Sequence, residues 1–302
     1  MVQQSETAQN RMEPSGQSAM PQLGLGTWQT GGYTCFNAVQ HALDIGYRHI
    51  DTAMAYENEA AVGRAIEASD VDRDDLFLTT KIKGYPELVE YDRLLEAAEG
   101  CLERLGTDYV DLLLIHWWNP VSDMEPTFAA MDRLVEEGKV NNIGVSNFSV
   151  DQLQKAMRVS DSPILTNQVE HHVYWQNTDI LKFCQKNDIT LTAYSPLAEG
   201  LLVNNEQLET IGNRYGKSAA QVAIRWLLQH ENVVTIPKTI TPEHMRSNLN
   251  VFDFSLTKRE MEMIHGVEAP LWYRTNREGG RVHQLRGILG KAVPDSVYNK
   301  LV

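Results

Sequence analysis

The sequence predicts an α/β fold, a (β/α)8 TIM barrel built as a single domain. Three observations support this class: the chain has 302 residues, strand-like and helix-like segments alternate along almost all of it, and the strand-like segments number eight. Eight strands, each followed by a helix, in roughly 250 residues is the count of this barrel. A doubly wound open sheet is the alternative, but no Gly-x-Gly-x-x-Gly follows any of the strand-like segments.

The predicted strands are short runs of apolar or β-branched residues. In chain order they cover residues 22–27, 49–51, 76–81, 109–116, 141–146, 164–168, 189–194 and 232–238. Helical patterns lie between them. The segment "DRLLEAAEGCLERL" (92–105) repeats apolar residues every three or four positions, which gives one apolar helix face. The segment "SAAQVAIRWLLQ" (218–229) opens with Ser218 and Gln221 at the spacing of a capping box.

Composition and charge narrow the class of protein. The chain is 42% hydrophobic and 22% charged, as in ordinary soluble domains, and its net charge of −13 disfavours nucleic acid or an anionic membrane as a partner. Three widely spaced cysteines without a Cys-x-x-Cys pair suit a reducing compartment, so we expect a cytoplasmic protein. Residues 1–19 lack the apolar stretch of a signal peptide, and we expect a flexible tail there. The barrel should cover residues 20–272, followed by a C-terminal loop or tail over residues 273–302.

The barrel model predicts where chemistry should lie, because the loops that follow the strands converge at one end of the barrel. Core packing does not require a polar or aromatic residue at each of these strand ends, yet the sequence has one at every end. We therefore expect a site there that includes Trp28, Asp51, Lys81, His116, Ser146, Asn147, Gln168, Tyr194, Ser195 and Lys238.

Four residues near these ends form a set with a clear chemical logic. A phenol such as Tyr56 has a pKa of about 10, so a nearby ammonium is needed to lower it, and a carboxylate can hold that ammonium charged. Lys81 and Asp51 suit these two roles, and His116 could orient a substrate oxygen. Such a set protonates a carbonyl oxygen while hydride reaches the carbon. Taken singly, Asp51 could cap a helix, Lys81 could pair with a surface acid, and Tyr56 could anchor a loop.

The order and spacing of several motifs resemble the aldo-keto reductase family over about residues 20–272. The similar segments are "GLGTW" (24–28), "DTAMAYENEAAVG" (51–63), "LGTDYVDLLLIHWW" (105–118), "GKVNNIGVSNFS" (138–149), "NQVEHHVYW" (167–175), "AYSPLAEG" (193–200) and "IPKTITPEH" (236–244). The chain departs from the family at Trp118, where Pro is usual. The short segment after it resembles the bacterial diketogluconate-reductase-like branch, which implies short substrate loops and an open cleft for small polar carbonyls.

The resemblance implies a role for each matching residue. Asp51, Tyr56, Lys81 and His116 match the catalytic tetrad, with Tyr56 as proton donor. The residues that match the cofactor site are Ser146, Asn147 and Gln168 for the nicotinamide carboxamide, Tyr194 for ring stacking, Ser195 and Leu197 for the pyrophosphate, and Lys238, Thr239, His244 and Asn248 for the adenosine 2′-phosphate end. The residues expected to line the substrate pocket are Trp28, Trp117 and Trp118.

Two residues near Lys238 differ from the family pattern and bear on the preference for NADP(H) over NAD(H). The family commonly has Arg and Glu six and nine residues beyond this lysine, where this chain has His244 and Ser247. We therefore expect NADP(H) to be favoured by a narrower margin, with NAD(H) as a second cofactor. The basic segment after Trp272, which contains Arg274 and Arg277, is expected either to cross the barrel mouth and meet an anionic group or to be a solvated terminus.

The sequence therefore predicts an NADP-dependent reductase of small aldehydes or ketones. We expect a monomer that binds a small carbonyl substrate, with no nucleic-acid or membrane partner. A nicotinamide-binding regulatory subunit with weak turnover is one alternative. A metal-dependent barrel hydrolase is another, because His171 and His172 could ligate zinc. Adjacent histidines rarely point at one ion, however, and no further ligands lie at a known spacing, so we expect no metal.

Overall fold

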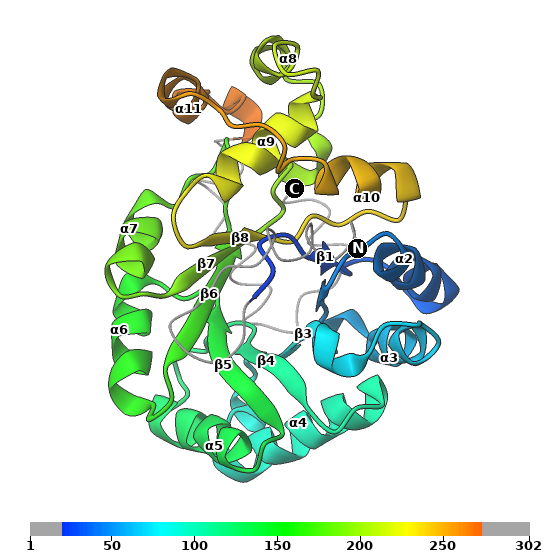
Figure 1. Ribbon diagram of the computed structural model, residues 1–302. Coiled ribbons are helices and arrows are strands. Elements are labelled where there is room, and N and C mark those ends of the chain that lie inside the picture. The colour runs from blue at the N-terminus through cyan, green and yellow to red at the C-terminus, as the bar shows by residue number, and fades with distance from the viewer. Residues whose placement is uncertain (1–19, 274–302) are drawn as a thin grey trace.

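The computed structural model describes residues 20–273, and its eight strands form one parallel sheet that curls into a barrel (Figure 1). Neighbours in the sheet are neighbours in the sequence, from the first strand to the eighth. The strands are β1 (Leu25–Gly26), β2 (His49–Asp51), β3 (Phe77–Ile82), β4 (Val110–Ile115), β5 (Val140–Ser146), β6 (Ile164–Glu170), β7 (Thr190–Tyr194) and β8 (Val233–Thr235).

The sheet closes between its last strand and the start of its first. Leu23 pairs in parallel with Thr235, the amide of Gly24 donates to the Thr235 carbonyl at 2.9 Å, and the amide of Thr235 donates to the Gln22 carbonyl at 2.9 Å. The predicted (β/α)8 barrel is therefore confirmed.

The helices form a ring around the outside of the sheet (Figure 1). They are α2 (Gly32–Asp44), α3 (Glu59–Glu67), α4 (Tyr91–Leu105), α5 (Met124–Glu136), α6 (Val150–Val159), α7 (Thr178–Lys186), α8 (Glu206–Gly212), α9 (Ala219–Leu228), α10 (Pro242–Leu249) and α11 (Lys258–His265). In α4 the predicted apolar face is buried at Leu94, Ala98 and Leu105. The capping box predicted for Ser218 and Gln221 is present at the start of α9.

The strand boundaries differ from the prediction mainly at the first and last strands. The predicted strand 22–27 shortens to β1, with a separate bridge at Leu23. The predicted strand 232–238 ends at Thr235. Pro237, which has no backbone N–H, cannot donate to a ladder and limits the strand there. At β6 the strand instead continues to Glu170, two residues beyond the predicted end.

The two faces of the sheet are packed differently. The large hydrophobic core includes side chains from the outer helices, and a smaller cluster gathers Met20, Phe77, Leu112, Leu114 and Val234. Because side chains alternate along a strand, Phe77 shares its face of β3 with Lys81. Buried polar side chains also lie at this level, because the ring of His49 packs 5.1 Å from that of Phe77 and its Nε2 lies 3.2 Å from Thr79 Oγ1.

The predicted tail at residues 1–19 and the segment 274–302 lie outside the described residues. Between residues 20 and 273, no helix is both long enough and apolar enough to cross a membrane.

Candidate active site

The ends of strands β2, β3 and β4 bring the predicted catalytic residues together. Asp51 ends β2, Lys81 lies near the end of β3, and His116 follows β4 directly. Tyr56 lies in the short 3-10 helix η1 (Met54–Tyr56). The Lys81 ammonium donates to Asp51 Oδ1 at 2.6 Å, to the Thr52 carbonyl at 2.8 Å and to the Tyr56 hydroxyl at 3.4 Å. One buried cation thus joins the carboxylate to the phenol.

Burial determines the protonation of the phenol and the ammonium. It raises the pKa of Tyr56 well above its usual value, and the charge of Asp51 adds to this rise. The sequence led us to expect that the ammonium lowers this pKa; the net change is instead a rise, because burial is the largest effect and the charge of Asp51 acts in the same direction. Burial also lowers the pKa of Lys81, and the charge of Asp51 opposes that change. Tyr56 therefore keeps its proton at neutral pH and is equipped to donate it.

His116 lies against Tyr56, with their ring centroids 5.7 Å apart in an edge-on arrangement. Burial, followed by the charges of Lys81 and Lys83, lowers the pKa of His116 to about 3. The imidazole is therefore neutral at physiological pH. A neutral imidazole has one N–H donor, which can hydrogen-bond an oxygen without competing as an acid.

A second polar group lies at the ends of β5, β6 and β7. Ser146 Oγ donates to the Gln168 carbonyl at 2.8 Å, Asn147 Nδ2 donates to the His116 carbonyl at 3.1 Å, and the Tyr194 hydroxyl donates to Asn147 Oδ1 at 3.0 Å. Gln168 Nε2 also donates to Asp51 Oδ2 at 2.7 Å, which sequence reasoning missed. This bond joins the predicted cofactor residues to the catalytic set.

The remaining predicted cofactor residues follow β7 and β8. Ser195 has a left-handed backbone (φ 50), and half-buried Leu197 precedes the turn η4 (Ala198–Gly200). Beyond β8, Lys238 is exposed and Thr239 is half-buried.

Two predicted residues lie on α10 in different environments. His244 is exposed, whereas Asn248 is buried and hydrogen-bonds the Tyr47 hydroxyl. A planar aromatic ring, amide and hydroxyl groups and an exposed lysine therefore lie around one end of the barrel. This donor and acceptor set fits a nicotinamide dinucleotide.

The three predicted pocket tryptophans have different surroundings. Trp28 is 45% exposed in the loop after β1, and Trp117 is half-buried after β4. Gly84 lies directly against the Trp117 backbone, since a Cβ on Gly84 would meet the Trp117 carbonyl oxygen at 1.4 Å. Trp118 is buried in the hydrophobic core, with its ring centroid 6.0 Å from that of Phe148. Contact of these rings with substrate stays a prediction.

The adjacent histidines have separate environments. His172 Nε2 lies 3.1 Å from both Glu170 Oε1 and the Tyr273 hydroxyl, whereas the ring of His171 stacks on Trp226. Over residues 20–273, no three His, Cys, Asp or Glu side chains are arranged to hold a metal ion.

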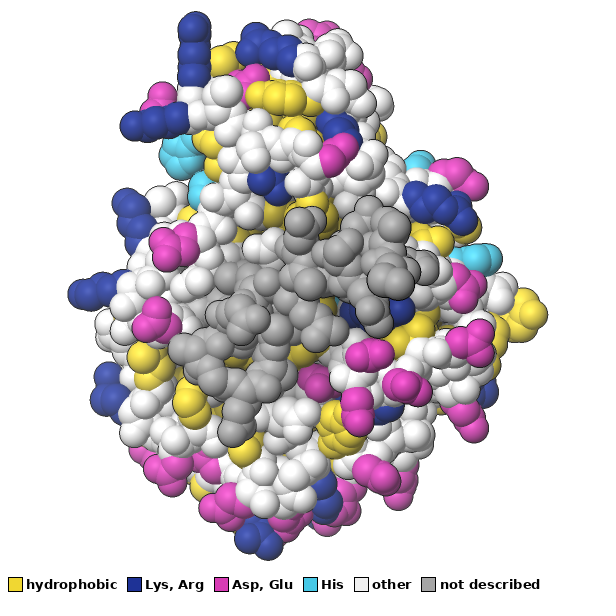
Figure 2. Space-filling model, in the orientation of Figure 1, with side chains coloured by type: hydrophobic (Ala, Val, Ile, Leu, Met, Phe, Trp, Pro, Cys, Tyr) yellow, Lys and Arg dark blue, Asp and Glu magenta, His cyan; other side chains and the backbone are white. Residues whose placement is uncertain are grey.

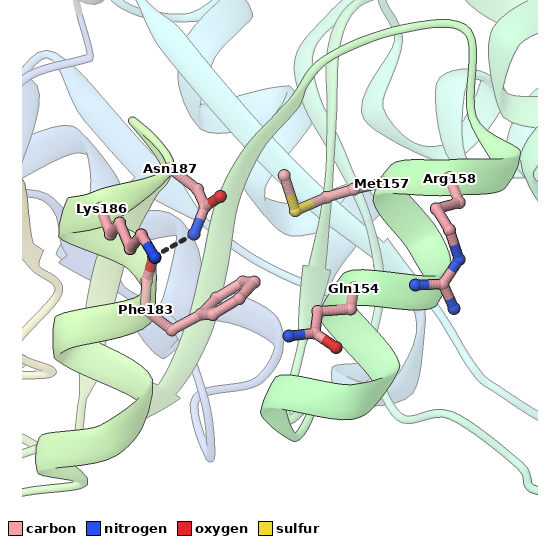
Figure 3. A pocket seen from close by; sticks show the side chains of 6 residues that line it. All are labelled: Gln154, Met157, Arg158, Phe183, Lys186 and Asn187. Atoms are coloured by element: carbon pink, nitrogen blue, oxygen red, sulfur yellow. Dashed lines mark hydrogen bonds between the residues drawn. The ribbon is translucent and has the colours of Figure 1, made fainter.

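A shallow groove lies on the outer ring, between α6 and α7 (Figure 3). It is lined by Gln154, Met157, Arg158, Phe183, Lys186 and Asn187. The groove is formed by helices on the outside of the sheet, whereas the catalytic set lies at the strand ends, so it is not part of this site.

Comparisons with known proteins agree on one family. Residues 22–269 match the model of the aldo/keto reductase family. The chain is 42% identical to a 9,11-endoperoxide prostaglandin H2 reductase of Trypanosoma cruzi, over 81% of this chain and 87% of the relative. It is 41% identical to a glyoxal reductase of Bacillus subtilis, over 82% of this chain and 89% of the relative.

Solved structures show the same likeness. A crystal structure assigned as a 2,5-diketo-D-gluconic acid reductase B has 39% identity and a TM-score of 0.83, and the match covers 87% of this chain and 94% of that one. An aldo-keto reductase crystallised with NADPH has 30% identity and a TM-score of 0.78, over 85% of this chain and 87% of that one.

Proposed function

The chain belongs to the aldo/keto reductase family, and from this premise we propose that it reduces small aldehydes or ketones to alcohols, with NADPH as the favoured hydride donor and Tyr56 as the proton donor. The observation that carries the proposal is the contact of Lys81 with both Asp51 and Tyr56, beside His116. This arrangement suits protonation of a carbonyl oxygen.

Each residue of the set has a distinct task. The neutral imidazole of His116 donates a hydrogen bond to the carbonyl oxygen and orients it beside the Tyr56 hydroxyl. Bound NADPH supplies the hydride that reaches the carbonyl carbon. Tyr56 gives its proton to the oxygen as negative charge develops there. The Lys81 ammonium then stabilises the tyrosinate, and Asp51 keeps the ammonium charged and in position.

The residues at the ends of β5 to β8 support the choice of cofactor. Ser146, Asn147 and Gln168 offer hydrogen-bonding groups for a carboxamide, and the half-buried ring of Tyr194 offers a face for stacking. Exposed Lys238 can meet the 2′-phosphate that distinguishes NADPH from NADH. We keep NADH as a second cofactor because His244 offers less charge than the usual arginine.

The names of two relatives support a small polar substrate, since one is a glyoxal reductase and one is assigned as a diketogluconic acid reductase. The three cysteines are free and buried, and we propose a cytoplasmic protein on that ground. A monomer stays a prediction. No observation favours the regulatory subunit or the metal-dependent hydrolase.

A direct test combines purified protein, NADPH or NADH and a panel of small carbonyl compounds, with cofactor absorbance as the readout. We expect turnover of short aldehydes or dicarbonyls. Tight nucleotide binding without turnover on any carbonyl would contradict the proposal.

A further inference from the structure

Lys83 lies beside the catalytic set, although sequence reasoning gave it no role. In the register of β3 with β4, Lys81 pairs with Leu114 and Ile82 pairs with Ile115. The amide of His116 donates to the Ile82 carbonyl at 2.9 Å, so the next step of this register brings Lys83 level with His116. Lys83 directly follows the last residue of β3, and if the alternation of the strand continues by one residue, its side chain lies on the same face as that of Lys81.

Two neighbours limit where the Lys83 ammonium can lie. It lies 5.9 Å from the centroid of the Tyr85 ring, at the outer range of a cation–π contact. The next residue, Gly84, lies against the Trp117 carbonyl, which ties this loop to the segment that carries His116. The charge of Lys83 is also among the causes of the lowered pKa of His116, which indicates that it acts on this ring.

The charge of Lys83 is not neutralised by the described part of the chain. Lys81, Lys139, Lys155 and Lys217 all have carboxylate partners within ion-pair distance, whereas no carboxylate between residues 20 and 273 forms an ion pair with Lys83. Glu87, four residues later, lines a separate groove with Arg93 and Arg104.

Four other lysines in the described part of the chain also lack an ion pair, but all four are exposed, whereas Lys83 is half-buried; they are Lys182, Lys186, Lys238 and Lys258. The protein carries a net charge of −13, and acidic side chains gather over α3 and α4, at the lower right of Figure 2. A half-buried lysine that has no acidic partner in an acidic protein, next to a catalytic histidine, is available to bind an anion from outside the chain.

We propose that Lys83 binds the anionic group of the substrate, so that the preferred substrates are carbonyl compounds that also carry a carboxylate. The inference rests on the proposed function. Tyr56 and His116 would hold the carbonyl oxygen, and Lys83, level with His116, would hold the carboxylate of the same small molecule. Binding of the carboxylate selects the substrate, and the proton and hydride steps are unchanged.

The test uses two aldehydes of the same size and shape that differ in charge, 4-carboxybenzaldehyde and 4-formylbenzamide. The variants are Lys83→Met, which keeps length but removes charge, and Lys83→Arg, which keeps charge. A hydrogen-bonded charge contact corresponds to about 10- to 100-fold in binding. We expect Lys83→Met to lower kcat/KM for the carboxylate by about this factor, mainly through KM, and to change the carboxamide little.

Two comparisons make the result specific to this site. Lys83→Arg should retain most of the preference for the carboxylate. Lys186→Met, the same change in the outer groove, should leave both aldehydes unaffected. The preference of the unmodified enzyme should also weaken with added salt, as for any partly exposed charge contact. Thermal melting of each variant checks that it folds.

The outcomes separate this inference from the proposed function. If the unmodified enzyme reduces both aldehydes and Lys83→Met affects them equally, or affects neither, Lys83 does not bind the anion and the inference is overturned while the reductase proposal stands. If the unmodified enzyme reduces neither these aldehydes nor any of the carbonyl panel with either cofactor, the proposed function fails and the inference fails with it.

Discussion

Gln168 and Asp51, 117 positions apart in the sequence, are joined by a buried hydrogen bond of 2.7 Å from Nε2 to Oδ2. An ionised carboxylate only accepts hydrogen bonds, so this contact fixes which way the amide of Gln168 is turned. Its Oε1 is left to accept a hydrogen bond from another group. The contact extends the series of hydrogen bonds in the site, which runs from Tyr56 through Lys81 to Asp51, as far as Gln168, a predicted cofactor residue.

We predict that Gln168→Leu weakens cofactor binding and slows turnover together. The substitution removes a carboxamide partner and also leaves Asp51 Oδ2 without this donor, and an unsatisfied buried polar group costs about 1–3 kcal/mol. Nucleotide titration and kcat measured separately would check both effects. Gln154→Leu, the same change in the outer groove, is the control. A loss of cofactor affinity with an unchanged kcat would show that the Asp51 contact has no catalytic consequence.

For Tyr56→Phe we expect carbonyl reduction to be lost while nucleotide binding stays nearly intact. The phenol is the only member of the set placed to give a proton to the developing alkoxide, and general acid catalysis is worth about 10²–10⁴ in rate. Steady-state kinetics with NADPH measures the fall in kcat, and nucleotide titration measures the binding. A variant that turns over at the rate of the unmodified enzyme would refute the assignment.

His244→Arg should tighten the binding of NADPH and change that of NADH little. The side chain is exposed on α10, and an arginine there would offer a permanently charged fork to the 2′-phosphate. A gain of about tenfold is reasonable for a charged hydrogen bond. Equal improvement for both cofactors would mean that this residue does not face the phosphate.

Because the protein has buried histidines, we expect its free energy of unfolding to decrease in acid. Burial lowers the pKa of His49 to about 4 and that of His171 to about 3, both below the unfolded value of about 6.5. Above pH ~6.5 both states are neutral at these rings, and below it the unfolded state takes up protons that the folded state does not. The free energy of unfolding should therefore decrease as pH falls from about 6.5 towards 3–4, by about 1.4 kcal/mol per pH unit for each such ring.

Urea unfolding at pH 7.5 and pH 5 tests this with His171→Phe, which keeps a ring against Trp226. The loss of stability between the two pH values should be smaller in this variant by about 2 kcal/mol. His41→Phe, the same change at an exposed position of α2, is the control variant. An unchanged pH dependence in His171→Phe would show that this ring is not held neutral by the fold.

The barrel could be predicted from the sequence because each strand and helix carries its own local pattern. The positions of Asp51, Lys81 and His116 at strand ends followed from the eight predicted strands of the sequence. The end of β8 and the shortness of β1 could not be predicted so well, because they depend on how the barrel closes around Thr235.

The finer properties of the site depend on three-dimensional contacts. The raised pKa of Tyr56 reflects burial, and burial is set by elements distant in the sequence. The bond between Gln168 and Asp51 crosses the barrel, and nothing in the local sequence of either residue indicates it. Lys83 could have been suspected from the sequence, because it lies two residues after Lys81 and the predicted alternation of a strand, continued by two residues, places both on one face.

The pairing of Leu23 with Thr235 has a consequence for how the protein is made. A ribosome releases the first strand long before the last. While the rest of the chain is synthesised, β1 therefore has no β8 to close the barrel against. During this interval both edges of the growing sheet expose unpaired backbone groups, which can pair with other chains. Synthesis beyond residue 235 ends this exposure, so nascent chains stalled earlier should depend most on chaperones.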